Sequence, residues 1–183
     1  MKLHTLILTL SALSFATPGM SNSFIIGDNL GVSCFNEAKL GRSDKDALAT
    51  CNSAIQNGVL SRTDIAATYV NRGIVRSNRG DFDGAVADYT KALRLDPTLG
   101  AAFANRGNVY IRMNEYTKAL HELNQALLLD LEQPAHVFYN RAIVHEHFGE
   151  KTKAYHDYKK ATELHPTWQP PKTELMRFIV KTN

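Results

Sequence analysis

The chain has 183 residues, of which 44% are hydrophobic and 21% charged, and its 21 Lys and Arg exceed its 18 Asp and Glu by only three. This composition argues against a disordered or collagen-like chain, and the small net charge argues against a nucleic-acid-binding protein. The two cysteines cannot supply a four-thiolate zinc site.

The N-terminus has the pattern of an export signal. A short positive start is followed by an apolar stretch of about ten residues, which is too short to cross a bilayer as a helix. Ser14 and Ala16 are the small residues that a signal peptidase requires. We therefore expect residues 1–16 to be a signal peptide, cleaved before Thr17, and residues 17–27 to be disordered or extended. The protein is then expected to be periplasmic or secreted, in a bacterium, and not stably inserted in the membrane once the signal is removed.

Two helices are expected next, over residues 28–40 and 44–56, with Ser43 as the cap of the second. In an oxidising compartment two remaining thiols usually pair. Antiparallel packing of these helices would bring Cys34 and Cys51 side by side, so we expect a disulfide between them. A reactive or metal-binding pair is the alternative.

From residue 66 onwards the sequence repeats itself at intervals of 34 and then 35 residues. The repeated positions include Asn-Arg-Gly or Asn-Arg-Ala at 71–73, 105–107 and 140–142, alanine at Ala85, Ala119 and Ala154, and helix-stop residues at Gly80, Asn114 and Gly149. Such a period predicts helix pairs that stack, because one helical hairpin cannot bury its apolar face alone. The expected helices are 65–78, 82–95, 99–112, 116–129, 134–147, 151–164 and 171–181.

These residues resemble the tetratricopeptide repeat family, whose pattern combines aromatic, Leu-Gly, Tyr, Ala and Pro positions over 34 residues. The resemblance covers 28–168, with a degenerate repeat at 28–61, full repeats at 66–99, 100–134 and 135–168, and a capping helix within 169–183. It implies an all-α fold, a right-handed solenoid of stacked antiparallel helix pairs. Trp168 is expected to pack beneath the cap. Arginine stands at the family's Leu position in all three full repeats.

Each of these arginines is followed sixteen residues later by an acid. The pairs are Arg72 with Asp88, Arg106 with Glu122, and Arg141 with Asp157. We interpret them as structural ion pairs, because a partly buried guanidinium needs a carboxylate. The alternative interpretation makes the arginines anion receptors in a groove.

The sequence shows no pattern of residues for catalysis. Six of the seven histidines fall between His121 and His165, but their spacing does not match a zinc motif. Phosphate-binding loops, nucleophile elbows and kinase motifs are also missing from the sequence. We expect no metal, no cofactor and no enzymatic activity.

The resemblance implies a protein-interaction module that binds an extended peptide or protein segment in its concave groove. Asn71, Asn105 and Asn140 occupy one repeated position, where the family's amides typically hold a peptide backbone, and an amide offers both donors and an acceptor. The other expected groove residues are Asn108, Arg112, Tyr139 and His147.

Two alternatives and one exclusion accompany this expectation. The asparagines could instead bind neighbouring helices, and the protein could be a structural subunit of an envelope complex that docks through its outer face or end helices. An acidic chaperone C-terminus is not an expected ligand, because Val70, Ala101 and Ala104 stand where related co-chaperones carry cations. The sequence leaves the partner protein and the oligomeric state open.

Overall fold

The computed structural model describes residues 29–57, 59–129 and 131–178. The expected signal peptide and the segment 17–27 therefore lie outside the described residues. The described helices are α1 (Asn29–Lys39), α2 (Lys45–Asn57), α3 (Arg62–Arg79), α4 (Phe82–Leu95), α5 (Gly100–Arg112), α6 (Tyr116–Leu127), α7 (Pro134–His147), α8 (Lys151–Leu164) and α9 (Gln169–Leu175), followed by the short 3-10 helix η1 (Met176–Phe178). These ranges contain no strand, and the all-α prediction is confirmed.

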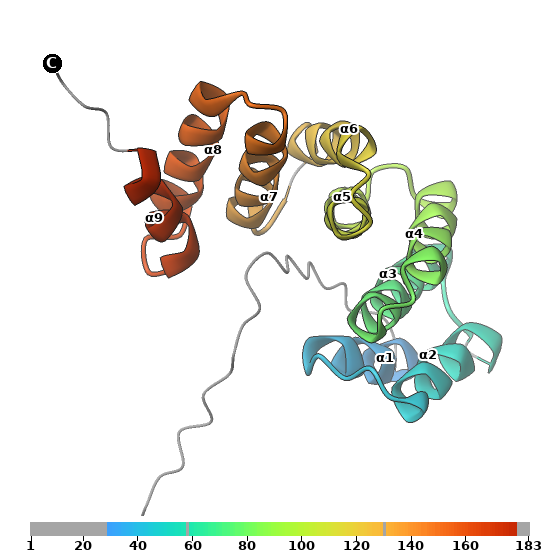
Figure 1. Cartoon of the computed structure of the whole chain (residues 1–183). Helices are drawn as coiled ribbons and strands as arrows, with labels where there is room; N and C mark the ends of the chain where they lie inside the picture. Colours follow the sequence, from blue (N-terminus) through green and yellow to red (C-terminus); the bar gives the residue numbers. More distant parts are fainter. Residues whose placement is uncertain (1–28, 58, 130, 179–183) are drawn as a thin grey trace, which may run out of the picture.

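Consecutive helices form antiparallel pairs that follow one another along an arc, as Figure 1 shows. The first helices of the pairs, α3, α5 and α7, lie on the inner side of the arc, and α4, α6 and α8 lie on its outer side. Each second helix also packs against the first helix of the next pair, and the shorter helix α9 packs against α8. The molecule is thus a curved solenoid with α9 at its end.

The turns inside the pairs form at the residues that the repeat predicts. Gly80, Asn114 and Gly149 all have positive φ, at 87°, 60° and 73°. This left-handed conformation suits glycine and, less well, asparagine, and it ends a helix abruptly.

Helix starts differ from the expected ones where a side chain caps the helix. The cap of α2 is Asp44 rather than Ser43, because the Asp44 carboxylate accepts a hydrogen bond from the Ala47 N–H at 2.8 Å. Helix α3 starts three residues earlier than expected. There the Ser61 hydroxyl accepts from the Asp64 N–H at 3.1 Å and donates to the Asp64 carboxylate at 2.6 Å.

The last helix also differs from its expected span, 171–181. It starts at Gln169, since prolines are tolerated in a first helical turn, and it tightens to 3-10 geometry after Leu175. None of the helices in the described ranges is long and apolar enough to cross a membrane.

Small residues let the two helices of a pair approach closely. A Cβ atom on Gly73 would lie 2.5 Å from a ring carbon of Tyr89, and Ala85 is fully buried beside them. At the N-terminal end, Cys34 and Cys51 form the predicted disulfide, with their Cα atoms 4.6 Å apart.

Candidate functional site

The repeated arginines form the ion pairs that the sixteen-residue spacing predicts. Arg72 donates to both carboxylate oxygens of Asp88, at 2.9 and 2.7 Å, and Arg141 donates to both oxygens of Asp157, at 2.7 and 2.8 Å. Arg106 contacts one oxygen of Glu122 through two nitrogens, at 2.9 and 2.8 Å. Each pair joins the two helices of one unit.

The same arginines also join neighbouring units. The remaining Nη1 atom donates to a side chain on the second helix of the preceding unit; the acceptors are Asn52 for Arg72 at 2.6 Å, Thr90 for Arg106 at 3.0 Å and Asn124 for Arg141 at 2.9 Å. Each guanidinium also lies over the aromatic ring three residues earlier in its own helix. Each guanidinium therefore contacts a carboxylate in its own unit, a polar side chain of the preceding unit and an aromatic ring. Because these contacts use the whole cation, the structure favours structural ion pairs over an anion receptor.

A second basic side chain lies beside the acid in two of the units. Arg76 donates to Asp88 at 2.9 Å, and His145 takes the corresponding position in the third full unit. The His145 ring lies between two carboxylates: its Nδ1 is 2.5 Å from Glu150 and its Nε2 is 3.7 Å from Asp157. His145 is therefore part of the packing of this unit.

The three repeated asparagines are buried inside the packing of the helices. Their exposed fractions are 1% for Asn71, 3% for Asn105 and 1% for Asn140. The repeated position is covered by protein in this structure, so these amides do not line an open groove here. Asn140 stands out among them, since neither its Oδ1 nor its Nδ2 has a hydrogen-bond partner among the described residues.

Two other expected groove residues form contacts between units. Arg112 donates to the carbonyl and hydroxyl oxygens of Ser77, at 2.9 and 3.0 Å, and lies 4.4 Å above the Phe82 ring. Burial lowers the pKa of the Arg112 guanidinium. His147 stacks on Tyr116 with their ring centroids 3.6 Å apart. These side chains join α5 and α7 to the preceding units, and their assignment to the groove stays a prediction.

Tyr139 belongs to the core of the last full unit. It is 4% exposed, and its ring lies 5.5 Å from that of Tyr158 and 5.0 Å from that of Trp168. Burial raises the pKa of its hydroxyl. The position of Trp168 confirms the prediction that it packs beneath the cap. Among the expected groove residues, Asn108, Arg112 and His147 retain partial or full exposure.

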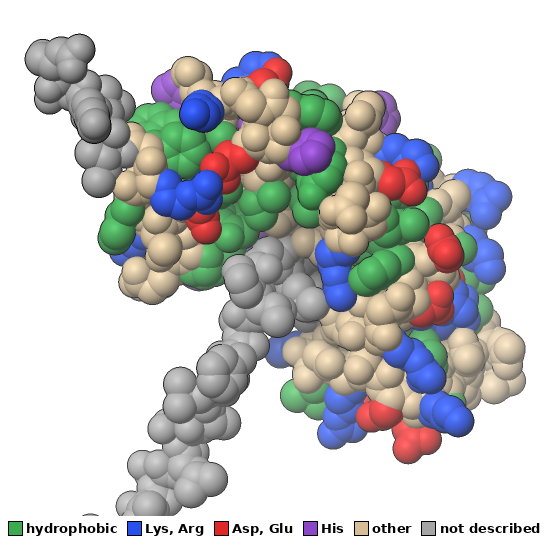
Figure 2. Space-filling model, in the orientation of Figure 1, with side chains coloured by type: hydrophobic (Ala, Val, Ile, Leu, Met, Phe, Trp, Pro, Cys, Tyr) green, Lys and Arg blue, Asp and Glu red, His purple; other side chains and the backbone are tan. Residues whose placement is uncertain are grey.

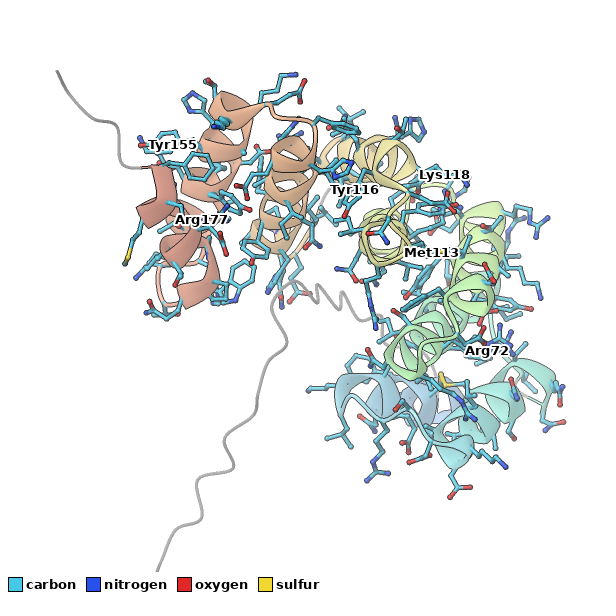
Figure 3. The ribbon with its side chains drawn as sticks, viewed as in Figure 1. Arg72, Met113, Tyr116, Lys118, Tyr155 and Arg177 are labelled. Atoms are coloured by element: carbon cyan, nitrogen blue, oxygen red, sulfur yellow. A yellow bond between two sulfur atoms is a disulfide. The ribbon has the colours of Figure 1, made fainter. Side chains whose placement is uncertain are left out.

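A polar cluster that the sequence did not predict holds the cap, α9 and η1, against α7 and α8. Glu146 accepts from the Tyr158 hydroxyl at 2.7 Å and from the Arg177 guanidinium at 3.0 Å, and Arg177 also pairs with Glu174. In Figure 3, Arg177 lies on the cap beside α7 and α8. No repeated spacing links Glu146 with Arg177, so the sequence carried no signal for this contact.

A cavity of about 400 Å³ lies where the α6–α7 and α8–α9 connections meet. It is lined by Glu132, Gln133, Pro134, Ala135, His136, Leu164 and His165. The Nδ1 atom of His136 is buried and has no partner among the described residues. Burial, and to a lesser extent His165, lower the pKa of this imidazole. Within the described ranges, no group of three histidine, cysteine or acidic side chains is arranged to hold a metal ion.

Comparison with known proteins identifies the repeats. Family models of the tetratricopeptide repeat match residues 66–99 and 101–133. The chain is 31% identical over 87 residues to human Tetratricopeptide repeat protein 6, a match that covers 48% of this chain and only 16% of that protein. A FAM10 family protein of Arabidopsis thaliana is 36% identical over 50 residues, which cover 27% of this chain and 11% of that protein.

Solved structures share the fold over most of the described chain. The crystal structure of MamA matches with a TM-score of 0.63 and 20% identity, covering 78% of this chain and 80% of MamA. YrrB, described as having an unusual peptide-binding site, matches with a TM-score of 0.61 and 26% identity, covering 68% and 62%. The second such domain of human RPAP3, in complex with an HSP70 peptide, matches with a TM-score of 0.60 and 25% identity, covering 66% and 100%.

Proposed function

Because the chain belongs to the tetratricopeptide repeat family, we propose that it is a non-enzymatic interaction module that binds an extended peptide or protein segment on its inner, concave side. Two observations support this proposal. The helices α3, α5 and α7 form one continuous inner wall (Figure 1). Similar folds in YrrB and human RPAP3 carry peptide sites.

The observation that carries the proposal is the buried amide of Asn140, which has no hydrogen-bond partner among the described residues. A buried amide without partners costs free energy, and such groups are rare in native proteins. A peptide backbone offers an N–H and a C=O, which are the partners that one amide side chain needs. On this proposal, a bound segment displaces the side chains that cover Asn140 and then pairs with its amide.

Substitution of Asn140 by alanine tests the proposal with two opposed readouts. Removing an amide that has no partner in the described part of the chain should leave the melting temperature of the free protein unchanged or raise it. The same change should weaken ligand binding by about tenfold, which corresponds to about 1.4 kcal/mol. The probe is a peptide selected on the protein from a phage-displayed random library, measured by isothermal titration calorimetry.

Asn124 provides the matched control. Asn124 lies on the outer helix α6, and its side chain accepts a hydrogen bond from Arg141 of α7. Asn124→Ala should therefore lower stability and leave peptide affinity unchanged. Unchanged affinity in Asn140→Ala would contradict the inner-side proposal and favour docking through the outer face or the end helices. We expect no binding of SRMEEVD, the HSP90 peptide to which the first TPR of Spaghetti (RPAP3) is bound, since Val70 and Ala104 are buried apolar residues.

We also propose that the protein is exported and acts in the bacterial periplasm or outside the cell. The Cys34–Cys51 disulfide supports an oxidising compartment, where such bonds form and persist. Exported protein should begin at Thr17 when its N-terminus is sequenced. Recovery of the same protein with Met1 still present would contradict export through a cleaved signal.

A further inference from the structure

The junctions between two full repeats share a pattern that the last unit breaks. Each of these two inner junctions uses three positions, four residues apart, on the second helix of the earlier repeat. They hold an aromatic, an aliphatic and a hydrogen-bond acceptor, which are Phe82, Val86 and Thr90 on α4 and Tyr116, Leu120 and Asn124 on α6. Residues four apart lie on one face of a helix.

The following unit supplies matching groups at each inner junction. Arg112 lies over Phe82, and His147 stacks on Tyr116. The aliphatic position packs into the apolar clusters that the next unit shares. Arg106 donates to Thr90, just as Arg141 donates to Asn124. An inner junction therefore pairs cationic or aromatic groups with rings and acceptors, around an apolar centre.

On α8 the same three positions are Lys151, Tyr155 and Lys159, and all three are exposed. Figure 3 shows Tyr155 on the side of α8 that faces away from α7. The described part of the cap, which ends at Phe178, covers this surface only in part. Phe178 lies 6.1 Å from Tyr155, measured between ring centroids, and the position that corresponds to Arg106 is Leu175.

The uncovered part is a shallow apolar hollow beside these cations. A cavity of about 250 Å³ is lined by Lys151, Thr152, Tyr155 and Phe178. Neither Lys151 nor Lys159 forms an ion pair with another described residue, whereas Lys153 and Lys160 on the same helix pair with Glu150 and Glu163. In Figure 2, hydrophobic side chains at the α8–α9 end lie next to Lys and Arg side chains.

We propose that Lys151, Tyr155, Lys159 and Phe178 form a docking surface for an acidic amphipathic helix of a partner protein. Lysines replace the ring and the acceptor of the inner junctions, so the complementary groups change from cations to carboxylates. The partner helix presents an acidic, an apolar and a second acidic side chain at four-residue intervals. The two acidic side chains meet Lys151 and Lys159, and the apolar side chain enters the hollow. This surface lies on an outer helix and does not depend on the inner-side function.

The geometry favours a helical protein partner over two other occupants. The corresponding positions on α4 and α6 contact a helix, α5 or α7, so the surface has the shape of a helix–helix junction. A second copy related by two-fold symmetry would place the same lysines against each other, and like charges repel. A lipid surface carries its charges on mobile headgroups and so presents no fixed spacing that matches these three positions.

Two designed peptides test the proposal. One is a capped helical peptide with Glu, Leu and Glu at four-residue spacing, and the other carries Lys in place of Glu. Fluorescence anisotropy should show that the protein binds the acidic peptide at least about tenfold more tightly. High salt should weaken that binding, because exposed charges are screened.

A charge-reversal variant gives the most specific test of the two lysines. Lys151→Glu combined with Lys159→Glu should transfer the preference to the lysine peptide, and Tyr155→Ser should weaken both complexes. The control, Lys153→Glu with Lys160→Glu, makes the same change in net charge on another part of α8 and should retain the acidic preference. Cooperative melting of each variant shows that it is folded. Asn140→Ala should leave this binding unchanged, which separates the docking surface from the inner side.

Three outcomes would overturn the proposal. One is equal binding of the two peptides by the unmodified chain. Another is equal loss of acidic-peptide binding in the control and in the Lys151 and Lys159 variant. The third is failure to bind either peptide, combined with one of two further results. Sedimentation with phosphatidylglycerol vesicles that depends on Lys151 and Lys159 would assign the surface to lipid. A dimer that the charge reversal disrupts would assign it to a second copy of this chain.

Discussion

Arg106 shows how one side chain in each unit supports both that unit and its neighbour. Its guanidinium contacts Glu122 within the unit, Thr90 in the preceding unit and the Phe103 ring in its own helix. The acid partner was predictable because the spacing of sixteen residues recurs three times. The acceptors on the preceding unit were not, because the residue type at this repeated position varies between asparagine and threonine, and neither type requires an arginine partner.

A double-mutant cycle on Arg106 and Glu122 measures this coupling. Both side chains are mostly buried, so Arg106→Leu and Glu122→Leu each leave an unpaired charge and should destabilise the fold by about 2–3 kcal/mol. The double variant removes both charges and should lose less than the sum of the two. Urea denaturation provides the free energies of unfolding. Strictly additive losses would show that the pair contributes no coupling.

His136 should make stability fall in mild acid. Burial lowers the pKa of its imidazole in the folded state below the ordinary value of about 6.5. The unfolded chain therefore takes up a proton first, and the contribution of His136 to stability is lost as the pH falls from about 6.5 towards the folded-state pKa. Thermal melting between pH 8 and pH 5, values spanning the usual histidine range, should show a flatter profile for His136→Gln. His121→Gln, at an exposed position, should keep the profile of the unmodified chain.

The α1–α2 pair is the unit that departs most from the repeat pattern, and it is the unit with a covalent link. Cys51 occupies the position at which later units carry Tyr89, Leu123 and Tyr158, so a disulfide stands where those units have a large side chain. The pairing was predictable from the two expected helices. The capping residues Asp44 and Ser61 were not, because several polar residues at each helix start compete for that role.

Replacing both cysteines by serine should destabilise the protein by about 3 kcal/mol, the chain-entropy value for a loop of this length. Because each unit contacts only its neighbours, the loss should concentrate in α1 and α2. Hydrogen exchange should then be faster in these helices than in α5–α8. Uniformly faster exchange along the whole chain would contradict local stabilisation.

Across the whole molecule, the units contact their neighbours in series, so stability at the ends depends on the capping contacts. The cap is held by a partly buried tryptophan and by a surface ion-pair cluster. Trp168 packs against Tyr139 and His136, with ring centroids 5.0 and 4.3 Å apart. Arg177, which pairs with Glu146, is 61% exposed. Apolar burial should dominate, because solvent screens exposed ion pairs.

Trp168→Ala should therefore destabilise the protein by about 2–3 kcal/mol and loosen α9, since it removes a large, partly buried side chain. Arg177→Ala should change the melting temperature only slightly. Calorimetry and hydrogen exchange of α9 measure the two effects. A larger loss from Arg177→Ala than from Trp168→Ala would show that the ion pairs, and not the aromatic packing, hold the cap.

The 34-residue period by itself determined the helix pairs, their turns, the intra-unit ion pairs and the order in which units stack. A period specifies which positions share an environment, and apolar positions at helical spacing specify which faces pack. It does not specify whether a shared polar position faces solvent or protein. Only the tertiary structure decided that Asn71, Asn105 and Asn140 are buried and that Arg112 and His147 stack between units, because burial depends on how neighbouring helices cover each position.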